Sequence, residues 1–185
     1  MIVSLFSEIP KCGNTLYVFD IDETTLYYNF RLDDHTVKII EDFEAKINPN
    51  NKDFFDMNAV WEQTLRQHPP IAHDRDGLED WKKFCDGNGS KIIFLTARFK
   101  TVEKTTIFHM QFLYPWVSAN DIHMCNGKEK GLVLFDLVTK TDYNTIIFVD
   151  DKEYNIRSVE KYIPMVNTYK MIINPDKLQK AGQPE

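Results

Sequence analysis

The chain has 185 residues, of which 43% are hydrophobic and 13% aromatic, enough for one domain or for one domain with a modest insertion. Its formal net charge of -6 argues against a nucleic-acid binder that works through a broad basic face. Cys12, Cys85 and Cys125 lie far apart without metal-binding spacing, which is typical of reduced thiols. With no apolar run of membrane-spanning length and no signal-peptide pattern at the N-terminus, we predict a cytoplasmic protein without a membrane partner.

The first predicted strand is the apolar run Leu16–Phe19, which is typical of a strand buried on both faces. Asp20 and Asp22 follow it. Because side chains alternate along a strand, carboxylates two residues apart point the same way where the strand persists. Such like charges need an offset, for which a divalent cation such as Mg²⁺ is the obvious candidate. On this segment alone, a polar turn in which Asp22 or Thr24 caps a helix is an equal alternative.

Residues 27–75 are predicted to form a small helical insertion without a strand of its own. One helix is expected to begin at Asp33 or Asp34 and to stop at the turn-forming segment Asn48–Asn51. A second helix is expected over Phe54–Gln67, before a pair of prolines.

Strands and helices alternate from Asp76 onward. We expect strands over Ile92–Leu95, Asp121–Cys125, Thr145–Val149 and Met165–Met171, and helices over Leu78–Cys85, Thr101–Phe112, Lys130–Lys140 and Lys152–Tyr162. Buried strands that alternate with helices predict an α/β fold, in which helices flank both faces of a parallel sheet. In such a sheet, ligands bind beyond the carboxyl ends of the strands.

Polar side chains follow each of the three strongest strands: Asp20 with Asp22, Thr96, and Asp150 with Asp151. Four carboxylates at one edge repel one another by roughly 4 kcal/mol per pair at about 4 Å and an effective dielectric constant of about 20. Bound Mg²⁺ offsets this repulsion and also takes phosphate oxygens as ligands. We therefore expect one aspartate to attack phosphorus and Asp22 to act as acid and base, its pKa raised by the neighbouring negative charge.

These segments resemble the four motifs of the haloacid dehalogenase superfamily of aspartate-nucleophile phosphohydrolases, in the family's order. The four motifs are Tyr17–Thr24, Ile92–Thr96, a lysine that opens a helix, and Ile146–Asp151. Lys130 is the best match for the lysine, and Lys128 is its rival. The segments Leu95–Arg98 and Asp150–Asn155 look like an acid-phosphatase-like branch of the superfamily.

The resemblance implies a Rossmann-like core of residues 1–26 and 76–185, with residues 27–75 as a small helical cap. It also implies hydrolysis of phosphomonoesters through a phospho-aspartate on Asp20, with Mg²⁺ as cofactor and Asp22 as general acid and base. The implied substrate is a phosphorylated small molecule or macromolecule. Nucleic acid is disfavoured as a partner.

Further residue roles follow from the same resemblance. The implied phosphate-binding residues are Thr96, Ala97, Arg98 and Lys130. The implied metal ligands are Asp20, Asp22 through its backbone carbonyl, Asp150 and Asp151. Asn155 would support the site. Two alternatives stay open: a phosphatase that acts on nucleic-acid ends, and an inactive binding protein that keeps the fold.

Overall fold

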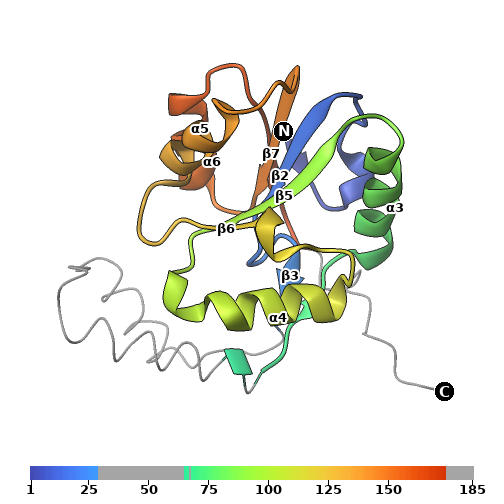
Figure 1. The fold of residues 1–185 in the computed structure, drawn as a ribbon, viewed down its shortest axis with the longest axis vertical. Helices are drawn as coiled ribbons and strands as arrows, with labels where there is room; N and C mark the ends of the chain where they lie inside the picture. The colour runs from blue at the N-terminus through green and yellow to red at the C-terminus, as the bar shows by residue number, and fades with distance from the viewer. Residues whose placement is uncertain (29–64, 67, 174–185) are drawn as a thin grey trace.

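The computed structural model describes residues 1–28, 65–66 and 68–173, and Figure 1 shows its ribbon. Six strands form one sheet in the order β1-β8-β7-β2-β5-β6, in which each neighbouring pair is parallel. The strands are β1 (Ile2–Val3), β2 (Thr15–Phe19), β5 (Lys91–Thr96), β6 (Ile122–Met124), β7 (Thr145–Asp150) and β8 (Asn167–Met171). The predicted α/β fold with a parallel sheet is confirmed.

Four helices flank this sheet in the part of the chain that the structure describes. They are α3 (Arg75–Asp86), α4 (Glu103–Leu113), α5 (Lys130–Val138) and α6 (Glu153–Tyr162). One hydrophobic cluster includes Phe19 of β2 and Trp81 of α3, and a second includes Val18 of β2 and Leu134 of α5. The two faces of β2 therefore serve two cores, one beneath α3 and α4 and the other beneath α5 and α6 (Figure 1).

The N-terminal segment contributes more structure than its sequence predicts. β1 (Ile2–Val3) pairs with β8 at the edge of the sheet. A single turn of 3₁₀ helix, Phe6–Glu8, then packs against α3, because the Trp81 indole donates a hydrogen bond to the Phe6 carbonyl oxygen at 2.9 Å. A two-residue strand is too short to show periodicity, so only its partner reveals it.

A second sheet corrects the prediction that residues 27–75 contain no strand. β3 (Leu26–Tyr27) pairs antiparallel with β4 (Ile71–Ala72). Both strands have only two residues, so neither could be recognised from alternation in the sequence. The helix predicted from Asp33 or Asp34 lies outside the described residues, as does most of the helix predicted over Phe54–Gln67.

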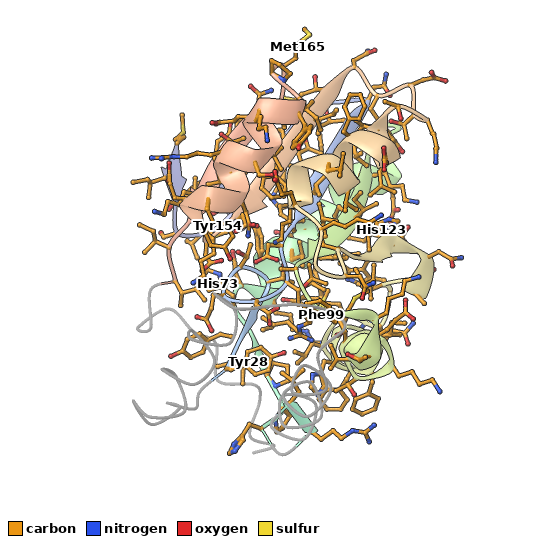
Figure 2. The ribbon with its side chains drawn as sticks, turned by 90° about the vertical axis from the view of Figure 1, so that its left-hand side faces the viewer. Tyr28, His73, Phe99, His123, Tyr154 and Met165 are labelled. Atoms are coloured by element: carbon orange, nitrogen blue, oxygen red, sulfur yellow. The ribbon has the colours of Figure 1, made fainter. Side chains whose placement is uncertain are left out.

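The two ends of the sheet are easily told apart in Figure 2. Met165, which precedes β8, lies at the end where the parallel strands begin. Tyr28 and Phe99, which follow β3 and β5, lie toward the opposite end, where the strands finish. Within the described residues, every helix is too short or too polar to cross a membrane. The three cysteines are free thiols, as predicted.

Candidate active site

The central strand β2 lies between β7 and β5, so three chain segments end side by side. Phe19 is in register with Val149 of β7 and with Phe94 of β5. The Asp20 amide donates a hydrogen bond to the Val149 carbonyl oxygen at 2.9 Å, so the β2–β7 ladder continues to Asp20 itself. This register brings Asp20 beside Asp150 at the carboxyl edge, where ligands bind in open parallel sheets.

A tight turn after Asp20 places Asp22 over the same edge. The Thr25 hydroxyl donates to the Asp20 carbonyl oxygen at 2.6 Å, and the Leu26 amide donates to the Ile21 carbonyl oxygen at 2.8 Å. Glu23 takes a left-handed conformation with φ of 57°, which is uncommon for a residue other than glycine and marks a constrained turn. The turn therefore holds the segment between β2 and β3 in one shape.

Lys130 lies at the centre of the site, between two buried carboxylates. Its ammonium group donates to Asp20 and, at 2.6 Å, to Asp150. Asp150 also accepts hydrogen bonds from the Lys152 amide at 2.8 Å and from the Asn155 side chain at 3.0 Å. Lys130 itself is 2% exposed, whereas Lys128 is exposed. Of the two candidate lysines, Lys130 is the one beside Asp20, and Asn155 supports Asp150.

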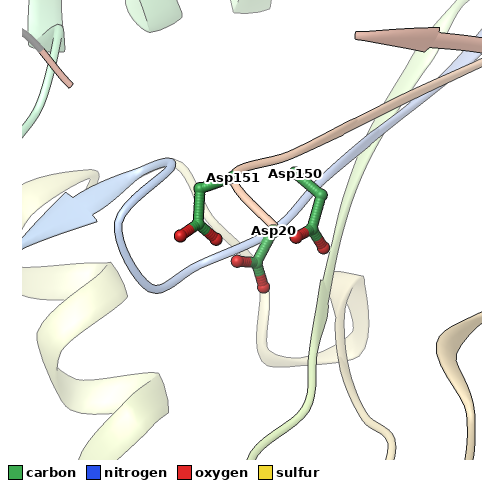
Figure 3. A group of neighbouring side chains, drawn as sticks. All are labelled: Asp20, Asp150 and Asp151. Atoms are coloured by element: carbon green, nitrogen blue, oxygen red, sulfur yellow. The ribbon is translucent and has the colours of Figure 1, made fainter. Parts of the chain in front are cut away.

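Asp20, Asp150 and Asp151 form a cluster that suits a metal ion. One carboxylate oxygen from each lies within 4.8 Å of the others, and Figure 3 shows the three side chains next to one another where β2 and β7 end. Around octahedral Mg²⁺, with a usual Mg–O distance of about 2.1 Å, adjacent oxygens are about 2.9 Å apart and opposite oxygens about 4.1 Å. The three carboxylates therefore suit Mg²⁺ if their side chains move inward.

Burial and mutual repulsion shift the ionisation of the cluster. Burial raises the pKa of Asp20 well above its ordinary value, and the Asp150 and Asp22 carboxylates raise it further, which Lys130 offsets only in part. Burial also raises the pKa of Asp151, against the opposing effect of Lys152, whose ammonium group is 2.8 Å from its carboxylate. The carboxylates of Asp20, Asp150 and Asp151 are thus paired with only two lysines, Lys130 and Lys152. One negative charge remains for a bound cation to balance.

Asp22 is in a different electrostatic environment from the one we expected. Burial does raise its pKa, but the charge and hydrogen bonds of the Arg98 guanidinium outweigh this effect, so the pKa is lowered overall. The Arg98 Nε and Nη2 atoms lie 2.9 and 2.6 Å from the two Asp22 carboxylate oxygens. The prediction of a raised pKa was wrong because Arg98 could not be recognised as a partner from a position 76 residues away.

The end of β5 brings the other predicted phosphate-binding residues to the same edge. The Thr96 hydroxyl lies 3.4 Å from Asp22, and it accepts a hydrogen bond from the Arg98 amide at 3.2 Å. Ala97 is exposed, whereas Arg98 is buried. All the predicted site residues therefore lie at one edge of the sheet, but their phosphate-binding and metal-binding roles stay predictions.

Some residues of the site were missed by the sequence reasoning. Tyr28 and Thr106 both accept hydrogen bonds from the Arg98 guanidinium, Thr106 at 2.8 Å. Burial and the charges of Asp151 and Asp22 raise the pKa of Glu23 to about 7. The Glu23 position beside two motif aspartates was a visible signal, whereas nothing in the local sequence marked Tyr28 or Thr106.

Gly131 lets α5 approach α6 closely enough to carry Lys130 into the site. A Cβ atom at this position would lie 2.2 Å from the Ser158 carbonyl oxygen of α6, far inside contact distance. We expect Gly131→Ala to lower the free energy of unfolding by about 1–3 kcal/mol, because the two helices must move apart. Urea unfolding measures this loss.

Gly87→Ala is the matched control, because the nearest atom to its Cβ would be 3.9 Å away. We expect it to change stability by less than about 0.5 kcal/mol. Equal stability losses in the two variants would contradict the close helix packing at Gly131.

The comparisons with known proteins agree with this architecture. A class C acid phosphatase from Bacillus anthracis matches 88% of this chain and 67% of its own, with a TM-score of 0.50 and 17% sequence identity. The same enzyme with tungstate bound matches with a TM-score of 0.50, 18% identity, 88% of this chain and 68% of its own. The chain has a haloacid dehalogenase fold. At such low identity the likeness concerns the haloacid dehalogenase fold alone.

Two other matches are weaker. The haloacid dehalogenase domain of the effector protein Lem4 from Legionella pneumophila, an inactive mutant, covers 90% of this chain and 87% of its own at 12% identity. Its TM-score of 0.48 is too low to support a conclusion. The family model described as "Protein of unknown function (DUF2608)" matches residues 117–174, less than half of the chain. No curated protein matches the chain by sequence.

Proposed function

We propose that the protein is a Mg²⁺-dependent phosphohydrolase that cleaves phosphomonoesters through a phospho-aspartate on Asp20. The observation that carries the proposal is the buried Asp20 carboxylate, held by Lys130 beside Asp150 and Asp151. A carboxylate in this setting can serve as a nucleophile. The haloacid dehalogenase fold and the acid-phosphatase likeness support a phosphoryl substrate.

In the first step, an Asp20 oxygen forms a bond to phosphorus while the bond from phosphorus to the ester oxygen breaks. The electron pair of the broken bond stays on the leaving oxygen, which takes a proton from the protonated form of Asp22. Arg98 lowers the pKa of Asp22, but the negative charge of a bound phosphoryl group would raise it and so favour this protonated form. Lys130 lies against Asp20 and carries a positive charge, so it stabilises the negative charge that builds on the transferring group. Thr96 and the backbone of Ala97, an exposed residue, are suited to hold the phosphoryl oxygens.

In the second step, water attacks the phospho-aspartate. Asp22 takes a proton from this water, a new bond forms between phosphorus and the water oxygen, and the bond from phosphorus to Asp20 breaks. Inorganic phosphate leaves, and the Asp20 carboxylate and protonated Asp22 are restored. The same two aspartates therefore serve both halves of the reaction.

Mg²⁺ would be held by Asp20, Asp150 and Asp151, with the Asp22 backbone carbonyl as a further expected ligand. When bound, Mg²⁺ supplies charge neutralisation and orientation of the phosphate oxygens. The donor set is all oxygen, as this cation prefers. Asn155 and the Lys152 amide fix the orientation of Asp150 for this purpose.

Removal of metal tests the proposal. We expect the protein to hydrolyse p-nitrophenyl phosphate with Mg²⁺ and to lose about a hundredfold or more of this rate in EDTA, since metal ions supply several kcal/mol of transition-state stabilisation. Added Mg²⁺ should restore the rate, and the larger Ca²⁺ should restore less of it. Equal turnover with and without EDTA would contradict the proposed role of the metal. No turnover with Mg²⁺ would favour the inactive binding protein instead.

A further inference from the structure

The Arg98 guanidinium donates hydrogen bonds to three other residues of the protein. Its Nε and Nη2 atoms donate to Asp22, its Nη1 atom donates to the Thr106 hydroxyl at 2.8 Å, and Nη2 also donates to the Tyr28 hydroxyl. Each of the three guanidinium nitrogens is thus engaged. The side chain of Arg98 is only 3% exposed, so the guanidinium is an internal anchor.

Asp22 is the exposed member of this pair. Its side chain is 32% exposed, compared with the 3% of Arg98. The planar guanidinium contacts both carboxylate oxygens, a geometry that sets the direction of a carboxylate as well as its distance. The Asp22 carboxylate is therefore partly open to solvent, and its contacts with the buried Arg98 guanidinium fix its orientation.

The supports of Arg98 come from two separate parts of the fold. Thr106 belongs to α4, and Tyr28 directly follows β3. The Tyr28 ring also lies beneath the guanidinium, 5.7 Å from its centroid, at a distance typical of a cation–π contact. Together they hold the guanidinium plane, and through it the plane of the Asp22 carboxylate.

We propose that Arg98 is a positioning residue, which orients the Asp22 carboxyl group for proton transfer to the leaving oxygen and does not itself contact the phosphoryl group. The inference rests on the proposed phosphatase function and adds the residue that aims its general acid. It replaces the sequence-based expectation that Arg98 binds substrate phosphate, because the guanidinium is buried and already engaged by protein groups.

Two closely matched esters distinguish these roles. Phenyl phosphate and p-nitrophenyl phosphate bind through the same phosphoryl group, but the less acidic phenol needs a proton from Asp22 more than p-nitrophenol does. General acid catalysis contributes about 10²–10⁴-fold. We therefore expect Arg98→Lys, which keeps the charge but loses the planar fork, to raise the ratio of kcat for p-nitrophenyl to phenyl phosphate about tenfold. KM should change little.

Milder variants keep the test valid if Arg98→Lys does not fold. Thr106→Val and Tyr28→Phe each remove one hydroxyl partner of Arg98, and we expect each to raise the same ratio about two- to fivefold, a small part of the general-acid contribution. Thr105→Val is the matched control, because Thr105 is a buried neighbour on α4 that is not among the described partners of Arg98. It should leave the ratio unchanged.

A double-mutant cycle completes the experiment. If Arg98 acts through Asp22, Arg98→Lys should not raise the ratio further in an Asp22→Asn background. A KM that rises equally for both esters, with an unchanged ratio, would show direct contact with phosphate and overturn the inference alone. A wild-type protein that hydrolyses neither ester would overturn the proposed function, and this inference with it.

Discussion

Asp20→Asn is expected to lower kcat for p-nitrophenyl phosphate by about 10⁴-fold or more, a loss typical of removing a catalytic nucleophile. An amide cannot form the phospho-enzyme at this position, and Asp150 is the other described carboxylate that pairs with Lys130. Asp150, the second partner of Lys130, is fixed by Asn155 and by the Lys152 amide. It is therefore not free to replace Asp20.

The fold should survive this substitution. Asparagine matches aspartate in shape. The substitution removes one buried negative charge, so Lys130 is left paired one-to-one with Asp150. We expect the melting temperature to stay within a few degrees of wild type, so that the loss of turnover reports chemistry.

Asp121→Asn is the matched control for this experiment. Asp121 pairs with Lys91 at 2.7 Å just before β6, at the opposite end of the sheet from the site. Its replacement should leave kcat unchanged. Retention of more than about a tenth of the rate in Asp20→Asn would rule out Asp20 as the nucleophile.

Lys130→Met is expected to cause the largest loss of stability, about 3–5 kcal/mol in the free energy of unfolding at neutral pH. Lys130, Asp20 and Asp150 are all at least 96% buried. Methionine fills a similar volume, but it leaves two buried carboxylates facing each other without a counter-ion. Urea denaturation measures the loss, and added Mg²⁺ is left out so that no other cation takes the place of the ammonium group.

Two further variants identify the cause of this loss. Lys128→Met removes an exposed lysine two residues earlier, and we expect it to change stability by less than about 0.5 kcal/mol. Asp20→Asn in the Lys130→Met background removes one of the unpaired carboxylates and should restore about 1–3 kcal/mol. If the double variant were as unstable as Lys130→Met alone, lost packing and not unpaired charge would explain the effect.

The strands and helices of the core were predictable because their signals are local. Apolar runs such as Ile92–Leu95 are found in β5, and Lys130 opens α5 as the motif required. The same local reasoning failed for β1, β3 and β4, each of two residues. Such short strands exist through hydrogen bonds to a distant partner, and no periodic pattern can develop over two positions.

The candidate active site was likewise predictable in part from the sequence. The sequence alone determined that Asp20, Asp22, Thr96 and Asp150 would follow buried parallel strands, and the alternation of strands with helices already required those strand ends to meet at one edge. Only the tertiary structure decided which charge each carboxylate faces. Lys130 bridges Asp20 and Asp150, while Arg98 takes Asp22 and lowers its pKa. Burial and periodicity can be predicted from neighbouring residues in the sequence. A pKa depends instead on distances between segments that only the folded chain brings together.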